Sequence, residues 1–153
     1  MITQRFNSFT GVYYRKIQIY MKKAFKQLGI SFDEGIVLQN VLLNPGTTQD
    51  RIAEVLVLDA AAVARSLKSL EAKGCLTRVI DMNNQRRKLV TITPDGEKLA
   101  HQINIAMNAW DTEIFKDMPE DQVARIVEST RYLHQRATEI DVLSIMPQIF
   151  ISD

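Results

Sequence analysis

Hydrophobic residues recur at intervals of three and four along much of the chain, which is the spacing of one face of an α-helix. The first such run predicts a helix over residues 9–28, and Gly29 follows it as a helix stop. Ser31 and Glu34 have the spacing of a capping box, so a second helix starts there and runs to about residue 43. This helix is apolar on nearly all sides, which predicts that it is buried.

Two short helices come next and are separated by only a few residues. Thr48 is a suitable N-cap for a helix that ends near residue 56, and Asp59 is a suitable N-cap for a helix over residues 60–73. Two short helices in this arrangement predict a helix-turn-helix unit.

The spacing of apolar residues changes after Gly74. Residues 76–81 and 88–93 are rich in Val, Ile, Leu and Thr, which predicts two short strands. The polar residues 82–88 between them predict a loop, so the two strands form a hairpin. A hairpin directly after a helix-turn-helix is the arrangement of a winged helix-turn-helix, and we call this hairpin the wing.

Thr93 and Pro94 then start a long helix, as an N-cap followed by a proline in the first turn. A last helix follows Pro119. The predicted inward face of the long helix consists of Leu99, Ile103, Ala106, Trp110 and Ile114. The predicted fold is therefore mainly α with a small β-hairpin. A winged helix-turn-helix at about residues 32–93 is flanked by dimerisation helices at about residues 8–28 and 94–150, within a single domain over residues 1–153.

Length and composition fit one domain. The chain has 153 residues, of which 46% are hydrophobic. This is enough for one domain with a hydrophobic core and short for two such domains. No apolar run approaches the roughly 18 residues that span a membrane, and the N-terminus does not resemble a signal peptide, so we expect a cytoplasmic protein. The single cysteine, Cys75, excludes an intramolecular disulfide framework. With only two histidines beside it, we expect neither a metal site nor a cofactor.

The net charge of +1 hides an uneven distribution. Residues 1–28 carry six basic residues and no acid. Residues 60–93 carry seven basic residues against two acids, whereas residues 94–153 carry five against eleven. A protein with this asymmetry presents a basic surface to phosphate groups and keeps its acidic parts away from them.

Two apolar features predict a homodimer. The segment 142–151 is unusually apolar for a chain terminus, and the first and last helices each carry an apolar face that a small monomer leaves exposed. A dimer in which the N- and C-terminal helices interlock covers both. The alternative is a tail that folds back onto its own core.

The helix at residues 60–73 has the two faces of a DNA-reading helix. One face carries Val63, Leu67 and Leu70, and the opposite face is small at its start and basic in its middle. Small residues allow close approach to a major groove, where Arg65 reaches a guanine edge or a phosphate. The outward residues expected to contact DNA are Ala61, Ala62, Arg65, Lys68 and Ser69. The alternative is an ordinary surface helix with solvated cations.

The wing favours double-stranded DNA as the partner, because its tip joins two asparagines to three consecutive cations. Arginine on a narrow ribbon suits a minor groove, and Asp81 is placed to pair with Arg86 and support the wing. The alternative is a solubilising basic loop. The remaining residues that we expect to contact DNA are Thr48, Gln49, Asn83, Asn84, Arg86, Arg87 and Lys88.

These residues resemble the MarR family of bacterial winged helix-turn-helix transcription regulators. The wing residues 81–86 are similar to the family pattern D-x-R/N-D-x-R and are followed by Leu-Val-Thr-Ile-Thr and Gly96. Residues 70–74 are similar to its L-x-x-K-G helix end. The motifs cover about residues 32–116, and the order of helices fits the whole chain. Two departures are Asn84, where the family usually has an aspartate, and Ala61–Ala62, where many members have Ser or Thr.

The resemblance implies a triangular homodimer whose N- and C-terminal helices form the interface and whose two winged units read a palindromic operator. Most members are repressors that are released by small aromatic or phenolic ligands bound between the dimer region and the winged unit. The aromatic residues that could line such a pocket here are Tyr13, Tyr14, Phe25 and Trp110.

Other functions have less support in the sequence. No Gly-rich phosphate loop, metal-ligand spacing or nucleophile elbow indicates an enzyme. Some members of the family sense oxidation, which makes Cys75 a candidate sensor, but its apolar neighbours predict a packed thiol. A winged helix used only for protein contacts does not need cations on both the helix and the wing.

Overall fold

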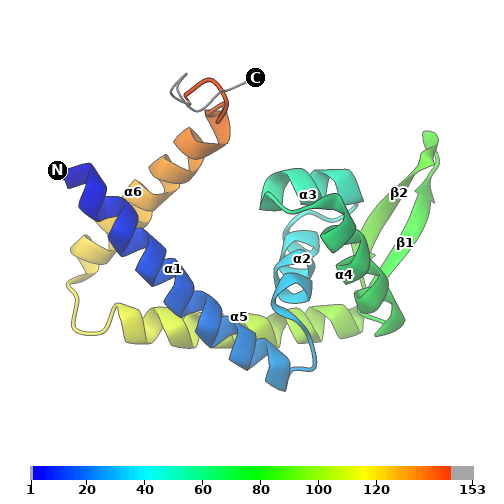
Figure 1. Cartoon of the computed structure of the whole chain (residues 1–153). Helices are drawn as coiled ribbons and strands as arrows, with labels where there is room; N and C mark the ends of the chain where they lie inside the picture. The colour runs from blue at the N-terminus through cyan, green and yellow to red at the C-terminus, as the bar shows by residue number, and fades with distance from the viewer. Residues whose placement is uncertain (1, 146–153) are drawn as a thin grey trace. The chain divides into compact units, whose positions relative to one another are not determined.

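The computed structural model describes residues 2–145, with the backbone only for residues 2–4 and Arg86 (Figure 1). The chain divides into two compact units, Met1–Asp111 and Thr112–Asp153. Its elements in chain order are α1 (Ile2–Gln27), α2 (Phe32–Leu43), α3 (Gln49–Leu56), α4 (Ala60–Ala72), β1 (Leu76–Asp81), β2 (Asn84–Ile92), α5 (Pro94–Ile114) and α6 (Glu120–Glu139). This order confirms a mainly α fold with a small β-hairpin. Within the described residues, no helix is long and apolar enough to cross a membrane.

The four helix starts that were predicted from N-cap residues are confirmed, because each N-cap side chain accepts a hydrogen bond from a backbone amide in the first turn of its helix. The caps and their donors are Ser31 with Glu34 N (3.1 Å), Thr48 with Arg51 N (3.3 Å), Asp59 with Ala62 N (3.0 Å) and Thr93 with Gly96 N (3.1 Å). At Ser31 the capping box is complete, since the Glu34 carboxylate accepts from the Ser31 backbone amide in return.

Two predicted boundaries are wrong. The first helix starts at Ile2 instead of residue 9, because a formed helix extends through residues that carry no regular apolar pattern. The second strand starts at Asn84 instead of residue 88, so residues 84–87 belong to the strand and not to a loop. The wing turn is therefore only Met82–Asn83, and the Asp81 carboxylate accepts a hydrogen bond from the Asn83 amide (2.9 Å). This side-chain bond closes a tight turn and lets strand pairing resume at Asn84.

The pairing of the two strands is irregular near the tip. From Leu76↔Ile92 to Ile80↔Lys88 the antiparallel register is regular, but the next pair is Asp81↔Asn84. Residues 85–87 therefore lie in a bulge, which re-aims side chains at the end of the wing. The segment before α3 adds an isolated bridge to the other edge of β2, between Thr47 and Val90. This bridge holds the start of α3 beside the wing.

One core joins α1–α5 and the sheet. In α5, Ile103 is buried as predicted, and Ala100 is buried with it, whereas the predicted inward position of Ile114 is wrong, because this residue is exposed. Gly35 of α2 lets the Phe25 ring pack directly against its backbone, since a Cβ at Gly35 lies only 2.4 Å from that ring. The residues of the core are Met21, Phe25, Ile30, Val37, Leu38, Val41, Ile52, Val63, Leu67, Leu70, Cys75, Leu76, Val90, Ala100 and Ile103.

Candidate nucleic-acid interface

The two predicted faces of α4 are present. Val63, Leu67 and Leu70 are fully buried in the core, so they anchor the helix. On the outer side Ala61, Arg65 and Lys68 are exposed, and Ala62 and Ser69 are half-buried. The exposed face thus carries small side chains at the N-terminus of α4 and cationic side chains one turn later. This arrangement suits close approach of the helix end to the major groove of DNA, with the longer cationic side chains at the edges of that groove.

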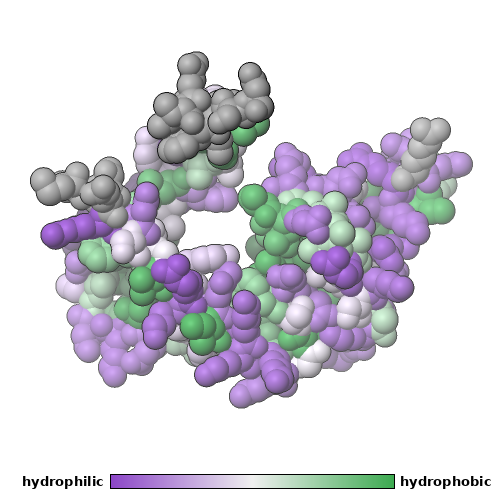
Figure 2. All heavy atoms as spheres, in the orientation of Figure 1, coloured by the Kyte–Doolittle hydropathy of each residue, from purple (hydrophilic) through white to green (hydrophobic). Residues whose placement is uncertain are grey.

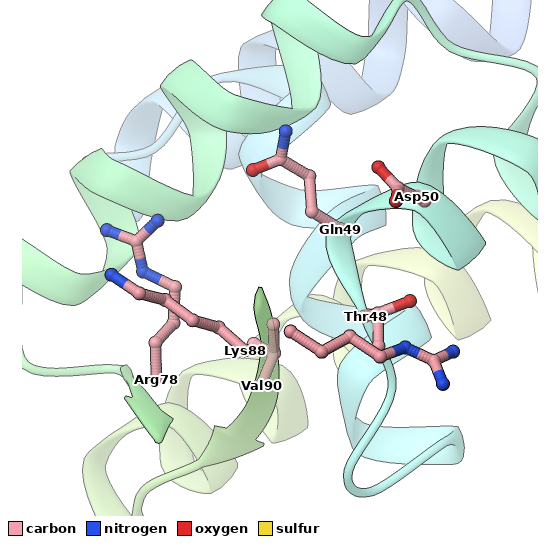
Figure 3. Close-up of a pocket in the computed structure, with 7 residues that line it drawn as sticks. Thr48, Gln49, Asp50, Arg78, Lys88 and Val90 are labelled. Carbon is pink, nitrogen blue, oxygen red and sulfur yellow. The ribbon is translucent and has the colours of Figure 1, made fainter. Parts of the chain in front are cut away.

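A groove of about 250 Å³ lies between the start of α3 and the wing (Figure 3). Arg78, Arg87 and Lys88 supply positive charge from the wing side, and α3 begins on the opposite side. The first amides of a helix favour an anion, so both walls suit a phosphate group. The lining residues are Thr48, Gln49, Asp50, Arg78, Arg87, Lys88 and Val90.

The two residues predicted at the start of α3 have different roles in this groove. Thr48 is buried, and its hydroxyl accepts the hydrogen bond that caps α3, so its side chain is mainly structural. Gln49 is half-buried and keeps its amide near the groove, as Figure 3 shows. Asp50 adds one negative charge to the same wall.

Arg78 is a groove residue that sequence reasoning missed. It is paired with Val90 in the sheet, and its half-buried side chain lines the groove while its guanidinium binds the Glu71 carboxylate. Alternation along β1 was a usable signal, because residues 76, 78 and 80 share one face of a strand. The buried Leu76 identifies that face as the inner one, so the next residue on it, Arg78, brings a cation to the edge of the core.

The other predicted wing residues lie near the tip. Asn83, Asn84, Arg87 and Lys88 are exposed, and Arg86 belongs to β2 but its side chain lies outside the described ones. Met82 of the turn is 94% exposed. The predicted pairing of Asp81 with Arg86 stays a prediction.

Lys73 connects the end of α4 to the start of α2. Its ammonium group donates to a Glu34 carboxylate oxygen (2.8 Å) and to the Gly29 carbonyl (2.9 Å). Burial raises the pKa of Glu34, but hydrogen bonds from Lys73 and Ser31 lower it more, so the pKa lies below its ordinary value. The charged pair therefore holds the end of α4 against the α1–α2 junction at neutral pH.

Cys75 is buried in the core, as predicted for a packed thiol. Burial raises the pKa of this thiol, which disfavours the reactive thiolate. The oxidation-sensing alternative is therefore not supported at Cys75.

The four predicted effector residues do not form one site. Tyr13 and Trp110 lie close together, with ring centroids 6.3 Å apart, and Tyr20 joins them at 5.3 Å from Trp110. Phe25 is only 2% exposed and stacks on Phe32 in the core, and Tyr14 is 57% exposed. Phe25 was misassigned because an aromatic at helical spacing has the same pattern in a core as beside a pocket. The Trp110 Nε1 atom is buried and has no hydrogen-bond partner among the described residues.

Comparisons with known proteins identify similar transcription regulators and similar folds. The chain is 25% identical over 111 residues to the uncharacterized HTH-type transcriptional regulator YybA of Bacillus subtilis (strain 168), covering 67% of this chain and 74% of that protein. A MarR transcriptional regulator from Methanosarcina mazei Go1 has a similar structure, with a TM-score of 0.81, 23% identity, and coverage of 94% of this chain and 99% of that chain.

A regulator from Listeria monocytogenes, assigned to the MarR family and crystallised in complex with 26mer DNA, is 22% identical with a TM-score of 0.79, covering 85% of this chain and 87% of that chain. The model of the MarR family matches residues 28–97, the segment that contains α4, the groove and the wing. The match over residues 28–97 therefore assigns this segment of the chain to the MarR family of transcription regulators.

Proposed function

We propose that the protein binds a specific double-stranded DNA sequence, with α4 in the major groove and the wing in the adjacent minor groove. The single observation that supports this most is that both α4 and the wing present exposed cations. Arg65 and Lys68 are exposed on α4, and Arg78, Arg87 and Lys88 line the groove beside α3. The groove accommodates a phosphate of the DNA backbone, which positions the protein, while α4 reads base edges.

The proposed contacts follow from the chemistry of each side chain. Arg65 is long enough to reach a guanine edge in the major groove, and the methyl groups of Ala61 and Ala62 suit contact with thymine. Lys68 and Ser69 lie farther along α4 and suit the DNA backbone. The wing residues Asn83, Asn84, Arg86, Arg87 and Lys88 suit the minor groove and its flanking phosphates.

Salt dependence tests the DNA proposal. A plot of log affinity against log salt concentration for a double-stranded duplex should fall steeply, because each phosphate that the protein neutralises contributes about −0.9 to the slope. Fluorescence anisotropy of a labelled duplex over a range of salt concentrations measures it. A duplex affinity that does not change with salt contradicts the proposal and favours the alternative of a protein-interaction module.

We also propose that the protein acts as a homodimer on a palindromic operator. Support comes from the exposed apolar side chains of α1, visible between hydrophilic ones in Figure 2, and from those of α6. A second copy covers such faces and duplicates the reading helix about a two-fold axis, which matches a palindrome. The larger exposed apolar residues of the two helices are Phe6, Phe9, Val12, Tyr13, Tyr14 and Ile19 of α1, and Ile126, Val127, Tyr132 and Leu133 of α6. The apolar tail also belongs to this proposal, although residues 146–153 lie outside the described ones.

Sedimentation of the purified protein tests the dimer. We expect twice the chain mass of 17.5 kDa, and Phe9→Glu should shift the mass toward the monomer because it places a charge on the apolar face of α1. Val57→Glu is the control, since Val57 is also an exposed apolar residue but lies between α3 and α4. A monomeric wild-type protein, or equal effects of the two variants, contradicts the proposal.

The regulatory mode that fits this family is repression relieved by a small aromatic ligand. The aromatic cluster of Tyr13, Tyr20 and Trp110, with a buried indole N–H that lacks a described acceptor, is the part of unit Met1–Asp111 that favours such a ligand. Trp110 is the only tryptophan of the chain, so its fluorescence during titration with aromatic acids is the direct measurement. Unchanged fluorescence and unchanged duplex affinity contradict ligand release at this cluster.

A further inference from the structure

An ion pair joins the end of the reading helix to the wing. Glu71 lies in the last turn of α4, and Arg78 is the third residue of β1. The Arg78 Nε atom donates to Glu71 Oε2 (3.0 Å), and Nη2 contacts the same oxygen. Both side chains keep only part of their surface exposed. This ion pair links α4 to the wing, the two elements that are proposed to enter neighbouring DNA grooves.

The pair remains charged at neutral pH. The hydrogen bond from Arg78 holds the pKa of Glu71 below its ordinary value, and the hydrogen bond to Glu71 raises the pKa of Arg78. Lys88 lies close enough to contribute to the same lowering of the Glu71 pKa. Glu71 is therefore an acid that interacts with two wing cations, Arg78 and Lys88.

The position of Arg78 gives this pair a consequence for DNA binding. Arg78 lines the groove together with Arg87 and Lys88. Figure 3 shows Arg78 and Lys88 across the groove from Gln49. While Glu71 binds its guanidinium, the charge of Arg78 is partly cancelled and its side chain is directed toward α4. A phosphate in the groove then meets less positive charge than three unpaired cations would supply, because Arg78 is paired with Glu71.

We propose that Glu71 is a positioning residue that increases sequence selectivity by holding Arg78. The pair keeps the wing at one angle to α4 and withholds one cation from the DNA backbone. Backbone contacts form on any sequence, whereas base contacts require α4 and the wing to fit their grooves together. Restraining Arg78 thus lowers non-specific binding more than specific binding. This inference rests on the proposed DNA-binding function.

Glu71→Gln tests it, because the amide keeps the size of the side chain and removes the charge. Two duplex probes are needed: one enriched from a random-sequence pool by the wild-type protein, and the unenriched pool itself. For the unenriched pool we expect roughly three- to tenfold tighter binding and a log–log salt slope steeper by about one, since Arg78 becomes free to bind a phosphate. The ratio of the two affinities should fall.

Two variants separate positioning from a change in total charge. Glu54→Gln removes one acid from the exposed Arg51–Glu54 pair of α3, so it matches the charge change without touching the wing. Glu71→Gln combined with Arg78→Gln removes the released cation, and we expect the salt slope to return to the wild-type value while the affinity ratio stays low. Circular dichroism of each variant establishes that it is folded.

Three results overturn the inference. These are a wild-type affinity ratio in Glu71→Gln, an equal change of slope in Glu54→Gln, or a slope that stays steep in the double variant. Failure of the underlying function is distinguishable from these results, because in that case the wild-type protein itself binds neither probe.

Discussion

Arg65→Ala should weaken binding to the enriched duplex by about 1–3 kcal/mol, which corresponds to a roughly 5- to 150-fold higher Kd. Arg65 is the exposed cation one helical turn after the small residues Ala61 and Ala62. A bidentate contact with guanine adds sequence preference as well as affinity, because its two donors match the two acceptors of that base. We therefore expect the affinity ratio between enriched and unenriched duplex to fall together with the affinity. Binding curves for both probes measure this.

The matched control is Arg131→Ala, which removes one exposed arginine from α6 and changes the net charge equally. Its effect on duplex affinity should be small, since it acts only through the overall charge of the protein. An Arg65→Ala variant that loses affinity equally for both probes assigns Arg65 to a phosphate. An Arg65→Ala variant that binds both probes like the wild type contradicts the proposal that α4 reads base edges.

Gly96→Ala should destabilise the fold by about 1–3 kcal/mol, with the value near the upper end of that range. A Cβ at Gly96 lies 2.1 Å from the Cys75 carbonyl oxygen and 2.7 Å from a side-chain carbon of Ile92. The first of these neighbours is backbone at the base of the wing, so it cannot move aside as the end of a flexible side chain does. The glycine thus lets α5 begin against β1 and β2, and it sets the base from which the wing extends. Denaturant unfolding followed by circular dichroism measures the change.

Gly11→Ala is the opposite case and serves as the control. Gly11 lies inside α1, and a Cβ there approaches the Arg15 guanidinium no closer than 3.8 Å. Alanine is the better helix former by about 0.8–1 kcal/mol, so this substitution should leave stability equal or higher. A Gly96→Ala protein as stable as the wild type contradicts the close approach of α5 to the wing base.

Local chemistry determined the features that sequence reasoning predicted well. The N-caps Ser31, Thr48, Asp59 and Thr93 act on amides three residues away, so their spacing alone places the helix starts. The two faces of α4 follow from helical periodicity in the same way, because a residue and its neighbours at three and four positions share one side. These interactions need no knowledge of the rest of the fold.

Contacts between distant residues determined the rest. Phe25 has the same helical spacing as a pocket aromatic, and only the approach of Gly35 places it in the core. The length of the wing depends on strand pairing, which polar residues near a tip do not reveal in their sequence pattern. The sequence by itself therefore determined that this chain has a capped two-faced helix, α4, followed by a basic hairpin. The tertiary structure alone decided that Arg78 lines the groove while bound to Glu71, because packing between α4 and β1 brings these two charges together.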